Sequence, residues 1–261
     1  MKFFGLCVVV SLFACGPQPS ATPDSTLRAS ATSGELTVEL RSDEPLHVGQ
    51  NVVRYRVLHD GVDAPHALIT QTPRMQMIMG SGETPHGCPL KNPDHEPNAD
   101  GFFEGLLVFT MPSSVDTRWS LTLEVELHHG AAPLLVDFGE LEIADSTSRQ
   151  FAMRDGQRVM LTAALESKPK LGANTFIVTA HRAEDAALLS WVPVTDLTFS
   201  VTPEMPVMGH GSSNNEAPVP GEDGLYRGTV NFMMAGDWVV HVGARAGDVA
   251  LTTFDVPFTV E

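Results

Sequence analysis

Residues 224–242 read GLYRGTVNFMMAGDWVVHV, and this stretch decides the fold because an earlier one carries the same landmarks. Residues 101–119 read GFFEGLLVFTMPSSVDTRW. In both stretches a glycine pair precedes a Phe, a Met and a Trp, and the earlier stretch has four extra residues before its Trp. Landmarks that recur in the same order indicate an internal duplication.

Further matched pairs extend the repeat toward the N-terminus of each copy. They are Gly49-Gln-Asn51 with Gly172-Ala-Asn174, Pro73-Arg-Met75 with Pro203-Glu-Met205, and Met79-Gly-Ser-Gly82 with Met208-Gly-His-Gly211. These pairs predict one domain over residues 35–145 and a second over 156–261. The polar residues 145–150 lie near the boundary.

Both copies read as strands rather than helices. Apolar and polar residues alternate over 35–40, 52–58, 121–127, 138–143 and 239–242, and turn residues separate these runs. The sequence therefore predicts an all-β protein of two immunoglobulin-like β-sandwich domains in tandem. Residues 184–189 are compatible with a single turn of helix.

The strand pattern also predicts which large side chains face the cores. Phe109 and Met111 share parity, as do Phe232 and Met234, so each pair is expected to point inward. Trp119 and Trp238 are expected to pack between the sheets.

The N-terminus, MKFFGLCVVVSLFAC, has a lysine followed by a short apolar run, which is typical of an export signal. The run is too short to remain as a membrane-spanning helix. Leu12-Phe13-Ala14-Cys15 resembles the lipobox of bacterial lipoproteins. The resemblance implies a signal peptide over 1–14, cleavage before Cys15, and a membrane anchor through a lipid on that cysteine. The alternative is an ordinary secretory signal with a chance cysteine.

Residues 15–34 are rich in Pro, Ser, Thr and Ala and lack an apolar period, so they are expected to form a flexible tether. Loss of the signal and lipidation of Cys15 would leave Cys88 as the one free cysteine, so no disulfide within the chain is expected.

Composition argues against several classes of function. The formal net charge is −16 and the pI about 4.9, which argues against nucleic-acid binding and against polybasic attachment to lipid. The chain has no nucleophile elbow, phosphate-binding loop, dinucleotide fingerprint or His-Glu-x-x-His motif. We therefore do not expect an enzyme.

The second copy resembles the YtkA-like/FixH-like family of small exported β-sandwich domains. The matching residues are Met205, Pro206, Met208, His210, Gly224, Tyr226, Met234, Gly236 and Trp238. The first copy matches more loosely, with Phe103 in the place of Tyr226 and Ser81 in the place of His210. Some members of this family are associated with copper handling in the envelope, so the resemblance implies that a metal is bound.

The residues of the second copy suit a soft metal ion. Met thioethers and His imidazoles together favour Cu(I). Met205, Met208 and His210 lie within six residues, and Met208 and His210 share a face if the segment is extended. Met233 and His241 are candidates to join from later strands. Alternatively, these methionines fill the core and His210 lies in a polar loop.

The first copy holds a second set of candidate ligands. Met75, Met77 and Met79 alternate along one strand face, and His86, Cys88 and His95 follow. Thioether, imidazole and thiolate are all ligands for soft metals. Alternatively, the segment is a surface loop with a free thiol beside a Met-lined core face.

Together these patterns predict a lipid-anchored envelope binding protein with two YtkA-like domains that takes Cu(I). The alternative is a structural or interaction module that docks another envelope protein without metal.

Overall fold

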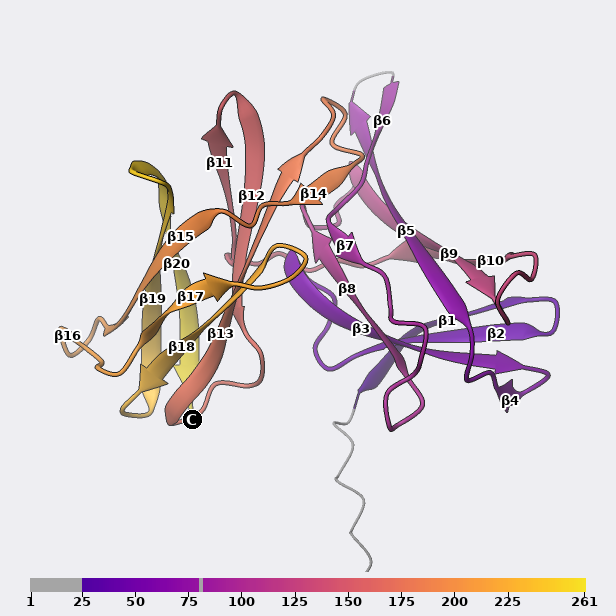
Figure 1. Cartoon of the computed structure of the whole chain (residues 1–261), viewed down its shortest axis with the longest axis horizontal. Coiled ribbons are helices and arrows are strands. Elements are labelled where there is room, and N and C mark those ends of the chain that lie inside the picture. The colour runs from indigo at the N-terminus through magenta and orange to yellow at the C-terminus, as the bar shows by residue number, and fades with distance from the viewer. Residues whose placement is uncertain (1–24, 80–81) are drawn as a thin grey trace, which may run out of the picture.

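The computed structural model describes residues 25–79 and 82–261, and every element in these ranges is a strand. The predicted signal peptide and the predicted lipid site at Cys15 lie outside the described residues. The strands form two β-sandwiches in tandem, which confirms the predicted fold class (Figure 1).

Domain one consists of ten strands in two antiparallel sheets. The first sheet has the order β1-β2-β3-β8-β7, with β4 also paired to β3, and the second has the order β10-β9-β5-β6. The bounds are β1 (Thr26–Ser33), β2 (Leu36–Ser42), β3 (Gly49–His59), β4 (Val62–Asp63), β5 (Leu68–Met79), β6 (Gly82–His86), β7 (Leu90–Lys91), β8 (Phe103–Phe109), β9 (Thr117–Glu126) and β10 (Leu134–Leu141).

Domain two repeats this topology strand for strand. Its sheets have the orders β11-β12-β13-β18-β17, with β14 also paired to β13, and β16-β15-β19-β20. The bounds are β11 (Arg149–Arg154), β12 (Gln157–Leu165), β13 (Gly172–Ala183), β14 (Trp191–Pro193), β15 (Leu197–Met205), β16 (His210–Gly211), β17 (Glu216–Pro220), β18 (Leu225–Phe232), β19 (Gly236–Ala246) and β20 (Val249–Val260). Each strand of domain one therefore has a counterpart in domain two.

Each sandwich encloses its own apolar core. Alternating residues of β2 are buried, as the period-two pattern predicts. Trp119 and Trp238 are fully buried, and each lies against the phenylalanine that ends the preceding core strand, with ring centroids 4.9 Å and 5.3 Å apart. The indole N–H groups of Trp119 and Trp238 donate to the carbonyls of Met111 and Met234. The predicted inward Trp positions are confirmed.

The prediction for Met234 was wrong. Phe232 is buried and Met111 packs partly against the first core, but Met234 is exposed. β18 ends at Phe232, so Met234 lies in the turn before β19, where strand parity no longer applies.

β3 and β13 each begin with the same set of three hydrogen bonds made by one asparagine side chain, which we call a clasp. The amide of Asn51 accepts from His47 N and donates to the carbonyls of His47 and Gly49. Asn174 makes the same three bonds one domain later, with Lys170 and Gly172 as partners. Because both amides are buried, these bonds replace water at the strand entrance in each copy.

Three segments differ from the sequence-based expectation. β1 occupies residues 26–33, which we expected to belong to the tether over 15–34. β11 begins at Arg149, before the expected start of domain two at residue 156. Residues 184–189 form a turn rather than a helical turn, and the carboxylate of Asp185 accepts from the backbone N–H groups of Leu189 and Ser190.

The two sandwiches pack through the outer faces of their first sheets. A third apolar cluster lies there, formed by Leu106, Val108 and Met160 with Phe151, Trp191 and Leu225 around them. Backbone contacts add to it, since Gly87 N donates to Leu188 O across the boundary at 2.9 Å. The strands at this contact are buried on both faces, which explains why β8 and β12 read as continuous apolar runs.

Within the described residues, no helix has the length and apolar character needed to cross a membrane.

Candidate functional site

The predicted ligands of domain two lie on one tight hairpin. Met205 ends β15 and lies directly opposite His210, the first residue of β16. The backbone N–H groups of Met208 and Gly209 both donate to Met205 O at 3.0 Å, which closes the turn between them. The structure thus brings Met205, Met208 and His210 together. The 208–210 segment is not extended, because Met208 lies in the turn, so the condition for a shared strand face is not met.

The three side chains differ in exposure. Met205 is buried, and its methyl carbon lies 3.2 Å from the place that a Cβ on Gly236 would occupy. His210 is half-buried, with its ring centroid 6.3 Å from that of Trp238. Met208 is 58% exposed. A buried thioether, a partly sheltered imidazole and an exposed thioether therefore lie on one hairpin at the end of the sandwich.

The adjoining turn adds two further thioethers. Met233 and Met234 are exposed in the β18–β19 turn, and Met234 O accepts from the indole of Trp238. Trp238 also faces His210, so this turn lies at the same end of domain two as the hairpin.

His241 does not join this set. Its Nδ1 lies 2.7 Å from Asp255 Oδ1 and its Nε2 lies 3.2 Å from Glu204 Oε2. The hydrogen bond to Asp255 is the main reason why the pKa of His241 is raised, and Glu204 adds to it. Both ring nitrogens are engaged by carboxylates, so His241 has no free ligand atom.

Domain one has a structural counterpart of the Met205–His210 pair. Met75 lies opposite His86 across β5 and β6, and opposite Trp119 across β5 and β9. His86, rather than Ser81, therefore stands in the place of His210. The sequence comparison missed this because the β5–β6 hairpin extends farther beyond Met75 than the β15–β16 hairpin extends beyond Met205.

The other methionines of domain one follow that extension. Met75 is buried in the first core, and Met77 packs partly against it. Met79 ends β5, two residues beyond Met77. Met75 and Met77 thus line the core face, and the exposed Ile78 that follows Met77 faces the other way.

His86 is tied to domain two. Its Nδ1 lies 2.5 Å from Ala187 O, a hydrogen bond in which the ring N–H donates to the carbonyl. This bond leaves Nε2 as the ligand atom, in the manner of metal-bound histidines that donate through their second nitrogen.

Cys88 is not placed as a thiolate ligand. It is buried in the first core, and desolvation raises the pKa of its thiol to about 12. The thiol therefore stays protonated near neutral pH, whereas metal binding requires the thiolate. His95 is exposed and lies apart from any strand.

One polar residue at the domain boundary was not predicted. His181 is 4% exposed, and among the described residues its Nδ1 has no hydrogen-bond partner. Burial lowers the pKa of His181 to about 4, so the ring is neutral. The cross-strand neighbour of His181 is Met160 of the interdomain cluster. The signal in the sequence that could have identified His181 was a histidine whose partner strand, β12, reads as a continuous apolar run.

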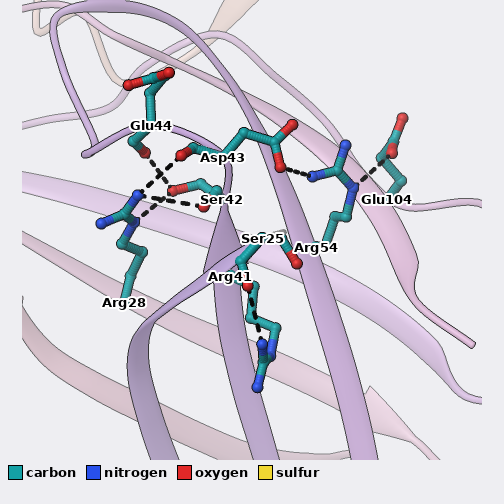
Figure 2. A network of polar contacts seen from close by, with 8 residues as sticks. All are labelled: Ser25, Arg28, Arg41, Ser42, Asp43, Glu44, Arg54 and Glu104. Atoms are coloured by element: carbon teal, nitrogen blue, oxygen red, sulfur yellow. Dashed lines mark hydrogen bonds and ion pairs between the residues drawn. The ribbon is translucent and has the colours of Figure 1, made fainter. Parts of the chain in front are cut away.

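A groove of about 580 Å³ lies beside the interdomain contact. Domain one contributes residues of β3 and β8, and domain two contributes the end of β12 with parts of β13 and β18. Figure 2 shows the charged network at its domain-one wall, where Arg54 bridges Asp43 and Glu104. These two carboxylates raise the pKa of Arg54 despite its partial burial.

Comparisons with known proteins give one family and several distant folds. The comparison with curated proteins gives no match. Among solved structures, the Escherichia coli adhesin FdeC is 15% identical with a TM-score of 0.26, covering 88% of this chain and 65% of its own. Domains 5–6 of the S-layer protein SbsC are 10% identical (TM-score 0.28; 91% and 99% covered), and the D0-D1 domain of intimin is 14% identical (TM-score 0.24; 88% and 99% covered). Structural similarities with TM-scores this low do not support an inference about function.

The family match falls on domain two. Residues 155–243 match the family model described as YtkA-like, a range that runs from the β11–β12 turn into β19 and includes the Met205–His210 hairpin. The matched range does not include domain one, although domain one has the same topology. Domain two is therefore similar to the YtkA-like family of domains.

Proposed function

We propose that this protein is a lipid-anchored envelope binding protein whose domain two takes Cu(I) at Met205, Met208 and His210. One observation carries the proposal, namely that a single hairpin closed by hydrogen bonds to Met205 O holds two thioethers and an imidazole. Such a donor set favours Cu(I) over Zn(II), since thioethers are poor zinc ligands.

The structure supports a site that is partly built before metal arrives. Met205 is held in the core beside Gly236, and His210 is held by the strand pairing and by contact with Trp238. Met208, in the turn, is the exposed ligand that closes over the ion. Domain one offers the equivalent Met75 and His86 as a second, weaker site, without Cys88 as a thiolate.

Titration of the chain from Gly16 onward with Cu(I), in competition with a chromogenic chelator, tests this proposal. Met208→Leu keeps apolar bulk and removes sulfur, and His210→Ala removes the imidazole. We expect each change to weaken Cu(I) binding by at least about tenfold, since loss of even an outer-shell partner of a metal ligand typically costs about 10–100-fold in affinity. Met153→Leu is the matched control, because Met153 is an exposed methionine on β11, outside this hairpin. Unchanged affinity in both variants would refute the site.

The anchor has its own test. Cys15→Ser should release the protein from membranes and abolish lipid labelling, because the lipid attaches to that thiol. If the variant stays in the membrane fraction as tightly as the parent, the lipobox interpretation is wrong.

The exposed apolar side chains at the end of domain two favour a second candidate, docking of another envelope protein. Val207 is 87% exposed beside Met208, with Met233 and Met234 at the same end. If Met208→Leu leaves partner capture intact while Val207→Asp abolishes it, this end of the domain binds protein rather than metal.

A further inference from the structure

The groove between the domains has an apolar floor. Val52 on β3 is 45% exposed although it lies in the sheet, and Leu106, Ile177 and Leu225 lie around it. Gln50 Nε2 donates to Ile177 O at 3.3 Å at the same place, so the two domains are already bonded there. Ligand sites occur preferentially at such domain interfaces, with volumes of this order.

The residues that line the groove carry more negative than positive charges. Its lining includes the carboxylates of Asp43, Glu44, Asp94, Glu104 and Glu166. Each lining cation is already paired: Arg54 with Asp43 and Glu104, Lys91 with Asp223, and Arg227 with Glu166.

Two carboxylates are left over. Within the described residues Glu44 and Asp94 make no ion pair and no side-chain hydrogen bond, and both are exposed to the groove. An incoming cation thus meets two anions that need not break an existing pair. An incoming anion meets only cations that are already neutralised.

We infer that this groove binds a basic, extended segment of a partner protein, in which cationic side chains alternate with apolar ones. The cationic side chains pair with Glu44 and Asp94 at the rim, and an apolar side chain covers the exposed Val52 on the floor. Electrostatic complementarity of this kind raises the association rate and selects the partner's sign of charge. The surface is separate from the hairpin at Met205–His210 and needs no metal.

A labelled peptide measures this interaction directly. The probe is a fluorescein-tagged peptide of alternating Lys and Leu, and its counterpart of alternating Glu and Leu is the charge control. Fluorescence anisotropy with the chain from Gly16 onward, in the presence of a copper chelator, should show binding of the Lys peptide alone. Binding should weaken as salt is raised, because the rim charges are exposed.

Charge reversal at the rim locates the site. Glu44→Lys with Asp94→Lys should weaken binding by at least about tenfold, since like charges then face each other. Asp116→Lys with Asp248→Lys changes the net charge equally at exposed positions outside the groove and should have less than a twofold effect. Val52→Asn should weaken binding several-fold without changing its salt dependence. Absence of binding to the wild type, or an equal loss in the control pair, would overturn the inference.

Discussion

The pKa of His181 differs between the folded and the unfolded chain. Its ordinary pKa of 6.5 falls to about 4 in the fold because burial disfavours the charged ring. Asp223 is the charged group facing it, and Lys91 of domain one lies 3.6 Å from that carboxylate. Protonation would therefore place an added charge where the two domains meet.

The sign of the pH dependence follows from this lowered pKa. The unfolded chain takes up the proton first as pH falls, so the stability contributed by neutral His181 is complete above its ordinary pKa and is lost between about pH 6.5 and pH 4. We expect a loss of at most about 3 kcal/mol from this group. Denaturant unfolding of wild type and His181→Gln across this range isolates it. Parallel pH curves for the two proteins would show that His181 is not buried as a neutral ring.

The buried indole of domain two gives a second prediction at this scale. Trp238→Ala should lower the free energy of unfolding by about 3–5 kcal/mol, because it leaves a cavity and an unpaired Met234 carbonyl. Trp238→Phe keeps an aromatic ring and should cost less. A loss below about 1 kcal/mol for the alanine variant, measured by chemical denaturation, would place the side chain at the surface.

At the scale of elements, the paired clasps of Asn51 and Asn174 predict equal behaviour in the two domains. Each amide makes the same three bonds at a strand entrance, so Asn51→Ala and Asn174→Ala should each cost about 1–3 kcal/mol. Hydrogen exchange resolved by domain should place each loss in its own sandwich. A large cost in one domain alone would mean that the two clasps are not equivalent.

Period-two alternation predicted the strands that have one face in the core and one in solvent, such as β2 and β9. It missed β1, whose sequence TLRASATS has little apolar content because the strand lies at a sheet edge. It also left the domain contact unseen. The continuous apolar runs in β8 and β12 signal burial on both faces, but nothing in one sequence says which surface covers the second face.

The candidate ligands were predictable as residues but not as pairs. The close spacing of Met205, Met208 and His210 predicted them as candidate ligands, and the structure places all three on the β15–β16 hairpin. The equivalence of His86 with His210 depends on strand register, which hairpins of unequal length hide from a linear comparison.

At the scale of the whole molecule, the two sandwiches pack against each other rather than being joined by a flexible linker alone. Besides the apolar cluster, Ser148 Oγ donates to Val48 O, and Lys91 pairs with Asp223. The groove beside this contact owes its shape to both domains.

A substitution at Gly87 tests the packing between the two domains. A Cβ at Gly87 would clash with Leu189 O of domain two, a backbone atom that cannot rotate away. Gly87→Ala should therefore loosen the contact, seen as faster hydrogen exchange at residues 184–191 and a shifted Trp191 emission, while both cores keep their protection. Thr70→Ala is the control, because Thr70 is an exposed residue of β5. Unchanged exchange at residues 184–191 in Gly87→Ala would contradict a fixed contact.

The proposed Cu(I) site lies at the end of domain two, on the β15–β16 hairpin. X-ray absorption at the copper edge of the Cu(I)-loaded chain from Gly16 onward tests it most directly, because sulfur and nitrogen neighbours scatter differently. We predict two sulfur ligands near 2.3 Å and one nitrogen near 2.0 Å, roughly the distances at which zinc sites hold sulfur and imidazole ligands. One sulfur should be lost in Met208→Leu and the nitrogen in His210→Ala. A copper shell of oxygen and nitrogen alone, or one that neither variant alters, would contradict the account.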